Sequence, residues 1–384
     1  MSFPYADFIN ILEKRFPHRV GLCEPELKGN ELKYLTECIE TGWVSTAGKF
    51  VSAFEEKIKD ISGAKFAIAT STGTSALHTL YLSAGIGPGD EVLTQSFTFI
   101  ATVNAISYCN ATPHFIDISD DPTLTIDPEK LKTYLTGIST LKNNQCINKA
   151  TGKPIKALVV MHTFGKATQL QECKNICDEF GIILLEDAAE ALGTKYKNKH
   201  VGSFGTGGVF SFNGNKITTC GAGGVIVTND QLLAEQAKHL STTAKQTHPY
   251  LYNHDQIGYN YRMANINAAV GLAQLEKLPE ILVKKKELFL SYKCLFKNTP
   301  SIKFLEDESW SKANHWLNAV ELQDCDHELL LKTLKIINDK SISVRPAWTP
   351  IHKLTSYSHC PRSDLSVTEA KASCVINLPS SSFL

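Results

Sequence analysis

The stretch FGTGGVFSFNGNKITTCGAGG, residues 204–224, places one lysine between a short apolar segment and a second group of glycines. Residues Val209–Phe212 are apolar and β-prone, which predicts a buried strand. Asn213 and Gly214 then predict a turn that presents Lys216 just beyond the strand end. The surrounding glycines leave room for a large flat ligand against the backbone. In its neutral form such a lysine can form a Schiff base with a carbonyl carbon; a solvent-exposed turn lysine is the alternative.

The composition limits the kinds of partner. The chain has 384 residues, which predicts two domains, and 39 basic residues balance 39 acidic ones. No global field therefore draws it to nucleic acid or to an anionic membrane. The N-terminus carries acids and lacks an apolar segment, and no later apolar run is long enough to span a bilayer. We expect a cytoplasmic protein that binds small ligands.

The eleven cysteines lack paired spacing, and their odd number indicates reduced thiols. Cys173 and Cys177 lie one helical turn apart, but no matching His or Cys pair accompanies them. The sequence therefore predicts no metal site.

Short apolar segments alternate with helical patterns through the first two thirds of the chain. The predicted strands are Phe66–Ala69, Glu91–Thr94, Pro113–Asp117, Lys156–Met161 and Gly181–Leu185. The predicted helices between them are Ala76–Ala84, Ile100–Tyr108, Pro128–Leu135 and Gln169–Phe180, with 137–153 as a polar surface insertion. This alternation predicts an α/β fold with a mostly parallel, doubly wound sheet. A smaller α+β domain follows, with strands Ala319–Leu322 and Ser341–Ser343 around helix Asp326–Asp339.

Polar and aromatic residues follow several of these strands, where ligands collect in open α/β sheets. Gly73, Thr74 and Ser75 place free amides at a helix N-terminus, which favours a phosphate, although Ser and Thr there also act as caps. Phe99 could stack on a planar cofactor or join the core. Asp187 follows a buried strand, so its carboxylate needs a partner. A cationic ring nitrogen would serve, as would an arginine or a helix cap.

Together these residues resemble the fold-type I pyridoxal phosphate (PLP) enzymes, and closely the DegT/DnrJ/EryC1/StrS sugar aminotransferase family. The motifs are TSTGTSALH (70–78), TFIATVNAI (98–106), HTFG (162–165), EDAAEALG (186–193), SFNGNKITTCGAGG (211–224), GYNYRMANINAAVGLAQLE (258–276) and RPAW with PIH (345–352). The resemblance implies a mostly parallel seven-stranded sheet flanked by helices. We expect a large PLP-binding domain at 20–255, a smaller α+β domain at 256–384, and residues 1–19 as an extension.

Within this family the chain resembles most closely the LegC-type branch. The signs are a long N-terminal lead, the insertion at 148–154, MHTFG, and FSFNGNK followed by STTAK at 241–245. That branch implies an aminotransferase acting on a UDP-linked 4-keto-6-deoxy-N-acetylhexosamine, on the way to bacillosamine or legionaminic acid.

The resemblance also implies roles for individual residues. Lys216 would carry the cofactor as a Schiff base and then move protons to and from the substrate carbons. Asp187 would hold the pyridinium nitrogen protonated. The remaining implied contacts are stacking by Phe99, phosphate contacts from Gly73, Thr74 and Ser211, and a phosphate contact from Asn260 of the neighbouring subunit. The last contact implies a homodimer with shared active sites.

Two positions depart from the commonest family pattern. Glu190 stands three residues after Asp187, where much of the family has Gln, so its contact near the ring hydroxyl needs a shared proton. Ala222 interrupts an expected run of glycines, and we expect its small methyl group to be tolerated.

The leading hypothesis is a transaminase that moves the amino group of L-glutamate to the ketone of a nucleotide-linked sugar. Candidates for holding the glutamate carboxylate or the sugar diphosphate are Ser45, Thr46, His162, Arg262, Arg345 and His352, each of which is equally explained as a surface charge or a cap. A PLP-dependent sugar dehydratase is a second hypothesis, although such relatives usually lack the lysine. A non-catalytic sensor that binds the cofactor or a sugar is the third.

Overall fold

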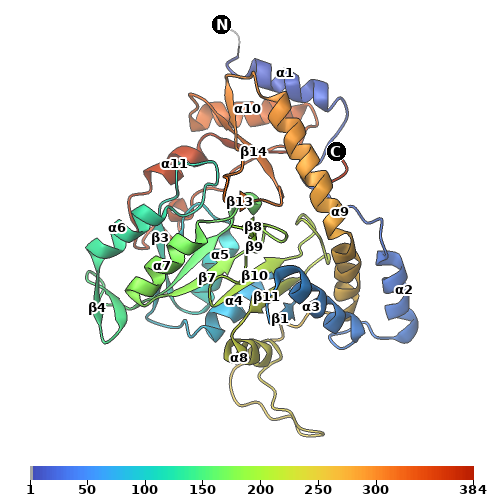
Figure 1. Ribbon diagram of the computed structural model, residues 1–384, viewed down its shortest axis with the longest axis vertical. Coiled ribbons are helices and arrows are strands. Elements are labelled where there is room, and N and C mark those ends of the chain that lie inside the picture. Colours follow the sequence, from blue (N-terminus) through green and yellow to red (C-terminus); the bar gives the residue numbers. More distant parts are fainter. Residues whose placement is uncertain (1–2) are drawn as a thin grey trace.

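The computed structural model describes residues 3–384 and is built around one seven-stranded sheet (Figure 1). The strand order is β1-β11-β10-β7-β6-β2-β3, and β11 runs antiparallel to both of its neighbours while the other pairs are parallel. The bounds are β1 Phe66–Thr70, β2 Glu91–Gln95, β3 Thr112–Ile116, β6 Ile155–Met161, β7 Ile183–Asp187, β10 Gly207–Ser211 and β11 Gly224–Thr228. The predicted, mostly parallel α/β sheet is confirmed.

Helices cover both faces of this sheet because successive strand residues point to opposite sides. Val92 packs in the core beneath α4 (Gly73–Ser83), α5 (Ile100–Tyr108) and α8 (Gln231–Ser241). Its neighbour Leu93 packs in the other core, with residues of α3, α6 and α7. Those helices span Lys49–Ser62, Pro128–Ile138 and Leu170–Phe180. Near-continuous apolar strands are what a sheet buried on both faces requires.

The C-terminal part forms a four-stranded antiparallel sheet in the order β12-β14-β16-β15. Its elements are β12 Ile302–Phe304, β14 Asn318–Leu322, β15 Arg345–Pro346 and β16 Val375–Leu378, with α1 Ala6–Arg15, α10 His327–Asp339 and α11 Ser366–Ala372 nearby. The predicted strand Ser341–Ser343 is wrong. Ser341 has a φ of 63°, so the chain turns there, and only Ile342 makes an isolated bridge, to Val20.

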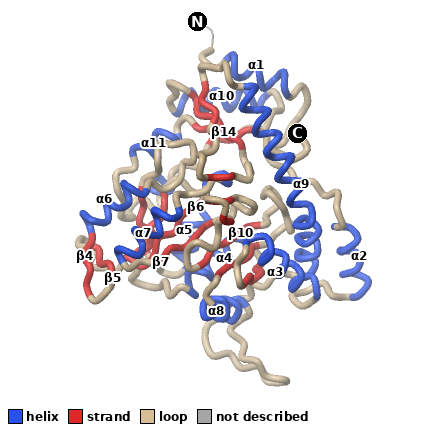
Figure 2. The backbone as a smooth tube through the Cα atoms, viewed as in Figure 1, coloured by secondary structure: helices blue, strands red, loops and turns tan. Residues whose placement is uncertain are grey.

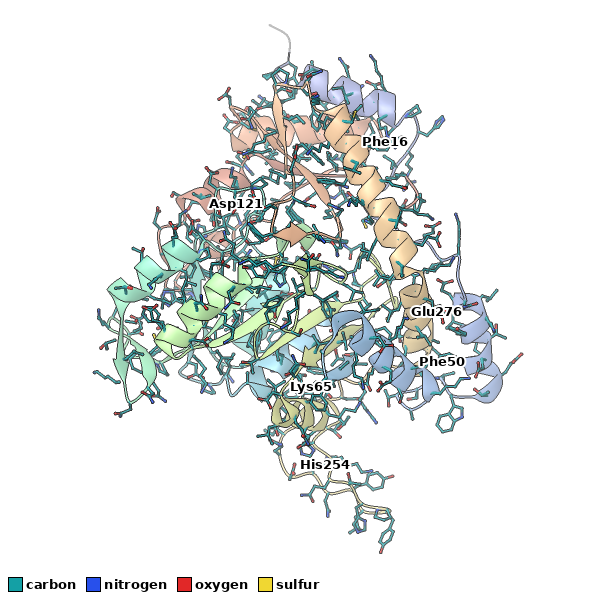
Figure 3. The ribbon with its side chains drawn as sticks, in the orientation of Figure 1. Phe16, Phe50, Lys65, Asp121, His254 and Glu276 are labelled. Atoms are coloured by element: carbon teal, nitrogen blue, oxygen red, sulfur yellow. The ribbon has the colours of Figure 1, made fainter. Side chains whose placement is uncertain are left out.

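Helix α9 (Asn265–Leu295) runs from α2 (Glu31–Thr41) and α3 to the second sheet (Figures 1 and 2). Glu276 of α9, labelled in Figure 3, accepts hydrogen bonds of 2.7 Å from Asn30 Nδ2 and from Tyr34 OH, which attaches α2. Among residues 3–384, no helix is both long and apolar enough to cross a membrane. The domain boundary at residues 255 and 256 stays a prediction.

The remaining short elements lie at the edges of the two sheets. The polar insertion forms the hairpin β4 (Ser139–Lys142) and β5 (Gln145–Asn148), and Asn148 Nδ2 donates to buried Glu91 at 2.8 Å. A three-stranded sheet combines β8 (Lys195–Tyr196), β9 (Lys199–His200) and β13 (Ser311–Lys312), and the 3-10 turns are η1 (Thr163–Gly165) and η2 (Ile351–Lys353).

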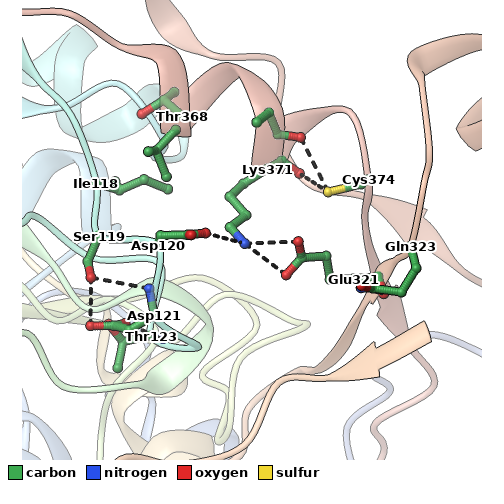
Figure 4. A network of polar contacts seen from close by, with 12 residues as sticks. Ile118, Ser119, Asp120, Asp121, Thr123, Glu321, Gln323, Thr368, Lys371 and Cys374 are labelled. Carbon is green, nitrogen blue, oxygen red and sulfur yellow. Dashed lines mark hydrogen bonds and ion pairs between the residues drawn. The ribbon is translucent and has the colours of Figure 1, made fainter. Parts of the chain in front are cut away.

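A buried lysine links the two main sheets (Figure 4). Lys371 of α11 is 7% exposed at its side chain, and its Nζ lies 2.7 Å from Asp120 Oδ1 and 2.8 Å from Glu321 Oε2. Asp120 follows β3 of the large sheet, whereas Glu321 lies in β14. Lys371 therefore ties the C-terminal sheet to the edge of the large one.

We expect Lys371→Met to lower the free energy of unfolding by about 2 kcal/mol, because the largely buried Glu321 carboxylate loses its charged donor. Urea denaturation followed by circular dichroism measures this. The matched control is Lys332→Met, which removes an exposed ion pair with Glu328 and should leave the midpoint unchanged. Equal midpoints for Lys371→Met and the wild type would contradict the prediction.

Candidate active site

A cavity of about 390 Å³ lies beside the ends of strands β6, β7 and β10. Parallel strands bring the polar residues that follow them to a common edge, and the chain turns there into loops and helices. The cavity is lined by seven of the predicted residues, namely Gly73, Thr74, Phe99, Asp187, Glu190, Ser211 and Lys216. Groups more than 140 residues apart in the chain are thereby placed around one space.

Lys216 enters the cavity from the turn after β10, as the sequence predicted. Its backbone N–H donates to Asn213 O at 3.0 Å, which closes the turn. Its Nζ donates to Glu190 Oε1 at 3.2 Å and lies 4.2 Å from the centroid of the Trp316 ring. The amine is thus held between a carboxylate and an aromatic face, inside the cavity.

Asp187 ends strand β7 and is almost completely buried. Its Oδ2 accepts from the Thr102 hydroxyl at 2.7 Å, and its Oδ1 accepts from Ala189 N–H at 3.1 Å. Burial raises the pKa of this carboxyl, and the two hydrogen bonds oppose the rise only in part. A cation brought into the cavity beside Asp187 would favour the ionised carboxylate.

Glu190 lies one turn beyond Asp187 and is also buried. Its Oε2 accepts from Phe164 N–H at 3.0 Å, and its Oε1 faces Lys216. Burial raises its pKa to about 7, against the opposing effect of the lysine charge. The carboxyl can therefore gain or lose a proton near neutral pH.

This raised pKa predicts a pH dependence of stability. Between the ordinary value of 4.5 and about 7, the folded chain binds more protons than the unfolded chain, so stability falls as pH rises through this window. Glu190→Gln removes the titration. We expect the variant to gain stability relative to wild type across the window, by about 3 kcal/mol.

The measurement is urea unfolding of cofactor-free protein at a series of pH values. The exposed Glu235→Gln serves as the control and should follow the wild type at every pH. A difference between Glu190→Gln and the wild type that stays constant from pH 4.5 to 7 would refute the assignment.

An anion-binding end is formed where α4 begins. The amides of Gly73 and Thr74 find no acceptor among residues 3–384. Ser75 does not share this property, which corrects the prediction, because its N–H donates to the Thr72 hydroxyl of the helix cap at 3.0 Å. A Cβ atom on Gly73 would lie 2.9 Å from Ser211 Oγ, so glycine is required for this close approach. Two free amides and a hydroxyl therefore face the same space.

Aromatic residues form one side of the cavity. Phe99, at the N-cap of α5, is 49% exposed, and its ring lies 6.5 Å from that of Trp348. These groups match the parts of PLP. The free amides suit its phosphate and the buried carboxylate suits its ring nitrogen. The exposed aromatic face suits the face of its ring, and the amine suits its carbonyl. The residues present fit this cofactor, and they are the ones that would hold it.

Three of the predicted substrate residues lie outside the cavity, and their side chains form hydrogen bonds with other residues of the chain. His162 is buried and donates through Nε2 to Glu186 at 3.1 Å, while its Nδ1 accepts from Thr168 N–H. His352 lies between Ser96 and Glu369, at 2.8 Å and 3.0 Å. Arg345 is exposed in β15 and donates to Asn338 Oδ1.

The other four predicted residues also do not line the cavity within one chain. Ser45, Asn260 and Arg262 are exposed, and Thr46 is partly so. The backbones of Asn260 and Arg262 form isolated bridges to Thr242 and Thr70.

The sequence interpretation missed three residues of the site. Thr102 holds Asp187, and Trp316 and Trp348 line the cavity. Trp348 belongs to the RPAW motif and Thr102 to the TFIATVNAI motif, so both motifs were identified, but neither residue was given a role. Trp316 had no local signal except its place just before a predicted strand.

Comparison with known proteins agrees with this geometry. The family model described as "DegT/DnrJ/EryC1/StrS aminotransferase family" matches residues 25–384. The chain is 35% identical to the GDP-perosamine synthase of Vibrio cholerae over 94% of each protein. It resembles the structure of Helicobacter pylori PseC, an aminotransferase of pseudoaminic acid biosynthesis, with a TM-score of 0.83, 26% identity and 94% coverage of both chains. The structure of DesI with its TDP-sugar product gives 0.81, 26% identity, and 95% and 88% coverage.

The matched family spans nearly the whole chain, and the cavity holds the groups that its cofactor requires. The chain belongs to the DegT/DnrJ/EryC1/StrS aminotransferase family and is a PLP-dependent sugar aminotransferase.

Proposed function

We propose that the enzyme transfers the amino group of L-glutamate to C4 of a nucleotide-linked 4-keto-6-deoxy sugar. The observation that carries this proposal is the placement of the Lys216 amine in one cavity with the buried Asp187 carboxylate and the free amides of Gly73 and Thr74. We further propose a UDP-linked N-acetylhexosamine as the acceptor, in bacillosamine or legionaminic acid biosynthesis.

Each residue of the cavity has a separate role in this proposal. When bound, PLP supplies a carbonyl for the amino group and a ring that takes up the electrons left when a C–H bond breaks. Asp187 would keep the ring nitrogen protonated, because a carboxylate beside a cation favours both charges. Lys216 Nζ would take the proton from Cα of glutamate and later deliver a proton to C4 of the sugar. Phe99 would cover one face of the ring.

The acceptor class has two kinds of support. Relatives of this chain make GDP-perosamine or form a TDP-sugar product, which supports a nucleotide-linked sugar. The choice of UDP and of an N-acetyl group rests on the sequence motifs of the LegC-type branch. Ser45, Thr46, His162, Arg262, Arg345 and His352 stay predictions for holding the substrates.

We also propose a homodimer in which Asn260 reaches the phosphate site of the second copy. The loop between α8 and α9 projects from the body of the molecule, and Figure 3 labels His254 on it. Three of its large side chains are uncovered, since Tyr250, Tyr252 and Ile257 are 78%, 79% and 84% exposed. Covering such residues with a second copy supports the dimer.

The test of the function is the visible absorbance spectrum of the protein with PLP, before and after glutamate. We expect a band of lysine-bound cofactor that glutamate converts to the spectrum of the amino form. The amino form is then mixed separately with UDP-, GDP- and dTDP-linked 4-keto-6-deoxy sugars, and products are identified by mass spectrometry. No spectral change with glutamate would refute the transaminase, and amination of only the GDP or dTDP sugar would refute the UDP assignment.

The shared site is tested with two variants, Lys216→Ala and Asn260→Ala, which are each mixed and reassembled. In a mixed dimer, one site combines both substitutions and the other is wild type in both. We expect activity to return on mixing. Two inactive variants that stay inactive after verified exchange of subunits would contradict the shared site.

A further inference from the structure

Lys285 of α9 is a buried lysine that the proposed chemistry does not use. Its side chain is 2% exposed. Its Nζ donates to the carbonyl oxygen of Trp316 at 2.9 Å and to that of Ser380, and it lies 3.6 Å from Cys23 Sγ. Among residues 3–384, no carboxylate forms an ion pair with it. The amine thus joins three segments that lie far apart in the chain.

Such a group is costly to bury. Burial without a charged partner disfavours the ammonium and lowers the pKa of Lys285. A Met or Leu side chain would fill similar space without this cost. A lysine at this position donates hydrogen bonds to the carbonyl oxygens of Trp316 and Ser380, which an apolar residue cannot do.

One of these contacts leads to the active site. Trp316, whose carbonyl is held by Lys285, donates through its indole Nε1 to Asn215 O at 2.7 Å. Asn215 precedes Lys216, and the indole ring lies 4.2 Å from the Lys216 amine. Trp316 is therefore fixed at its backbone by one lysine and covers the other with its ring.

A second contact strengthens this arrangement. The Trp316 N–H donates to Asn314 Oδ1 at 2.9 Å, and Asn314 Nδ2 donates to the backbone oxygen of Glu190 at 2.8 Å. Glu190 is the carboxylate that receives the hydrogen bond of Lys216. The segment containing Trp316 is thus attached to both groups that hold the Lys216 amine.

We propose that Lys285 is a positioning residue of the active site. It fixes the Trp316 backbone so that the indole face keeps the amine of Lys216 in the cavity, beside Glu190. The proposal rests on the proposed function, in which Lys216 is the reactive lysine. The amine is free during part of each cycle, and its position then decides how well it can move protons.

The test compares Lys285→Met, Trp316→Leu and the double variant with Lys286→Met, an exposed neighbour on the same helix. Cofactor-free protein is briefly treated with acetic anhydride, and acetylation of Lys216 is measured by peptide mass spectrometry. We expect Lys216 to be acetylated faster in Lys285→Met, by roughly tenfold, since the amine is less confined. Trp316→Leu should give the same rise, and Lys286→Met should give none.

The double variant separates positioning from general damage. Because Lys285 acts through Trp316, the double variant should be acetylated no faster than Trp316→Leu alone. Additive effects, or an unchanged acetylation rate in folded Lys285→Met, would overturn the proposal. If Lys285→Met does not fold, an unchanged rate in Trp316→Leu overturns it, and a raised rate there supports it.

Activity gives a second readout. With glutamate, kcat of Lys285→Met should fall by roughly tenfold while KM stays near the wild-type value, because the substrate contacts are untouched. Acetylation needs neither cofactor nor turnover. A failure of this proposal, seen as unchanged acetylation while glutamate still converts the bound cofactor, is therefore distinguishable from a failure of the proposed function, seen as no conversion by glutamate.

Discussion

Replacement of Lys216 by alanine is expected to lower kcat with glutamate by about 10⁴-fold, the upper end of what a positioned acid or base contributes. The variant loses the only amine among the cavity-lining residues described here. It also loses the contact to Glu190. The measurement is kcat with a saturating keto sugar, together with borohydride reduction of the PLP-loaded protein and peptide mass spectrometry.

In the wild type, reduction should fix the cofactor on Lys216, and in Lys216→Ala no fixed cofactor should remain. Lys65→Ala, at an exposed position just before β1, is the control and should behave as the wild type. A reduced adduct on another lysine, or turnover in Lys216→Ala within tenfold of the wild type, would contradict the assignment.

Asp187→Asn is expected to lower kcat by about 10²–10³-fold, because a neutral amide cannot stabilise a protonated ring nitrogen. The amide has nearly the shape of the carboxylate and can still meet Thr102 and Ala189. The loss should therefore come from charge and not from packing. The rate of the glutamate half-reaction, followed by absorbance, measures it.

Stability separates this explanation from misfolding. In the cofactor-free chain the Asp187 carboxylate is buried beside few compensating charges, so Asp187→Asn should be at least as resistant to urea as the wild type. The exposed Asp178→Asn is the control for an added amide. A variant that unfolds earlier, or that reacts with glutamate at the wild-type rate, would count against a catalytic role for the charge.

The sheet could be predicted because its strands are short apolar runs with turn residues between them. Residues such as Val92 and Leu93 are buried on opposite faces, so nearly every strand position is apolar and the signal is strong. Lys216 and Asp187 could be predicted as neighbours for a related reason. Asp187 ends one such run and Lys216 follows another after a short turn, and parallel strands end at the same edge.

The same reasoning does not tell which polar residues bond within the core. His162 directly follows strand β6 and Asp187 ends strand β7, yet His162 bonds to Glu186 and does not line the cavity. Glu186 and Asp187 are adjacent, so their side chains point to opposite sides, and the carboxylate of Glu186 lies among the amides of residues 202–205. A pattern of residue types does not tell which of two adjacent polar side chains forms hydrogen bonds within the core and which one lines the cavity.

The strands of the α/β sheet and the turn that presents Lys216 could be predicted because short apolar runs and turn residues are local signals. The free amides of Gly73 and Thr74 also have a local cause, since both residues lie in the first turn of α4. Packing between distant segments, in contrast, places the Trp316 ring over the lysine, Thr102 against Asp187, and Lys285 against the Trp316 carbonyl. Those contacts join residues 31 to 100 positions apart. Local propensity carries no information about them, since they form only when the sheets and α9 pack together.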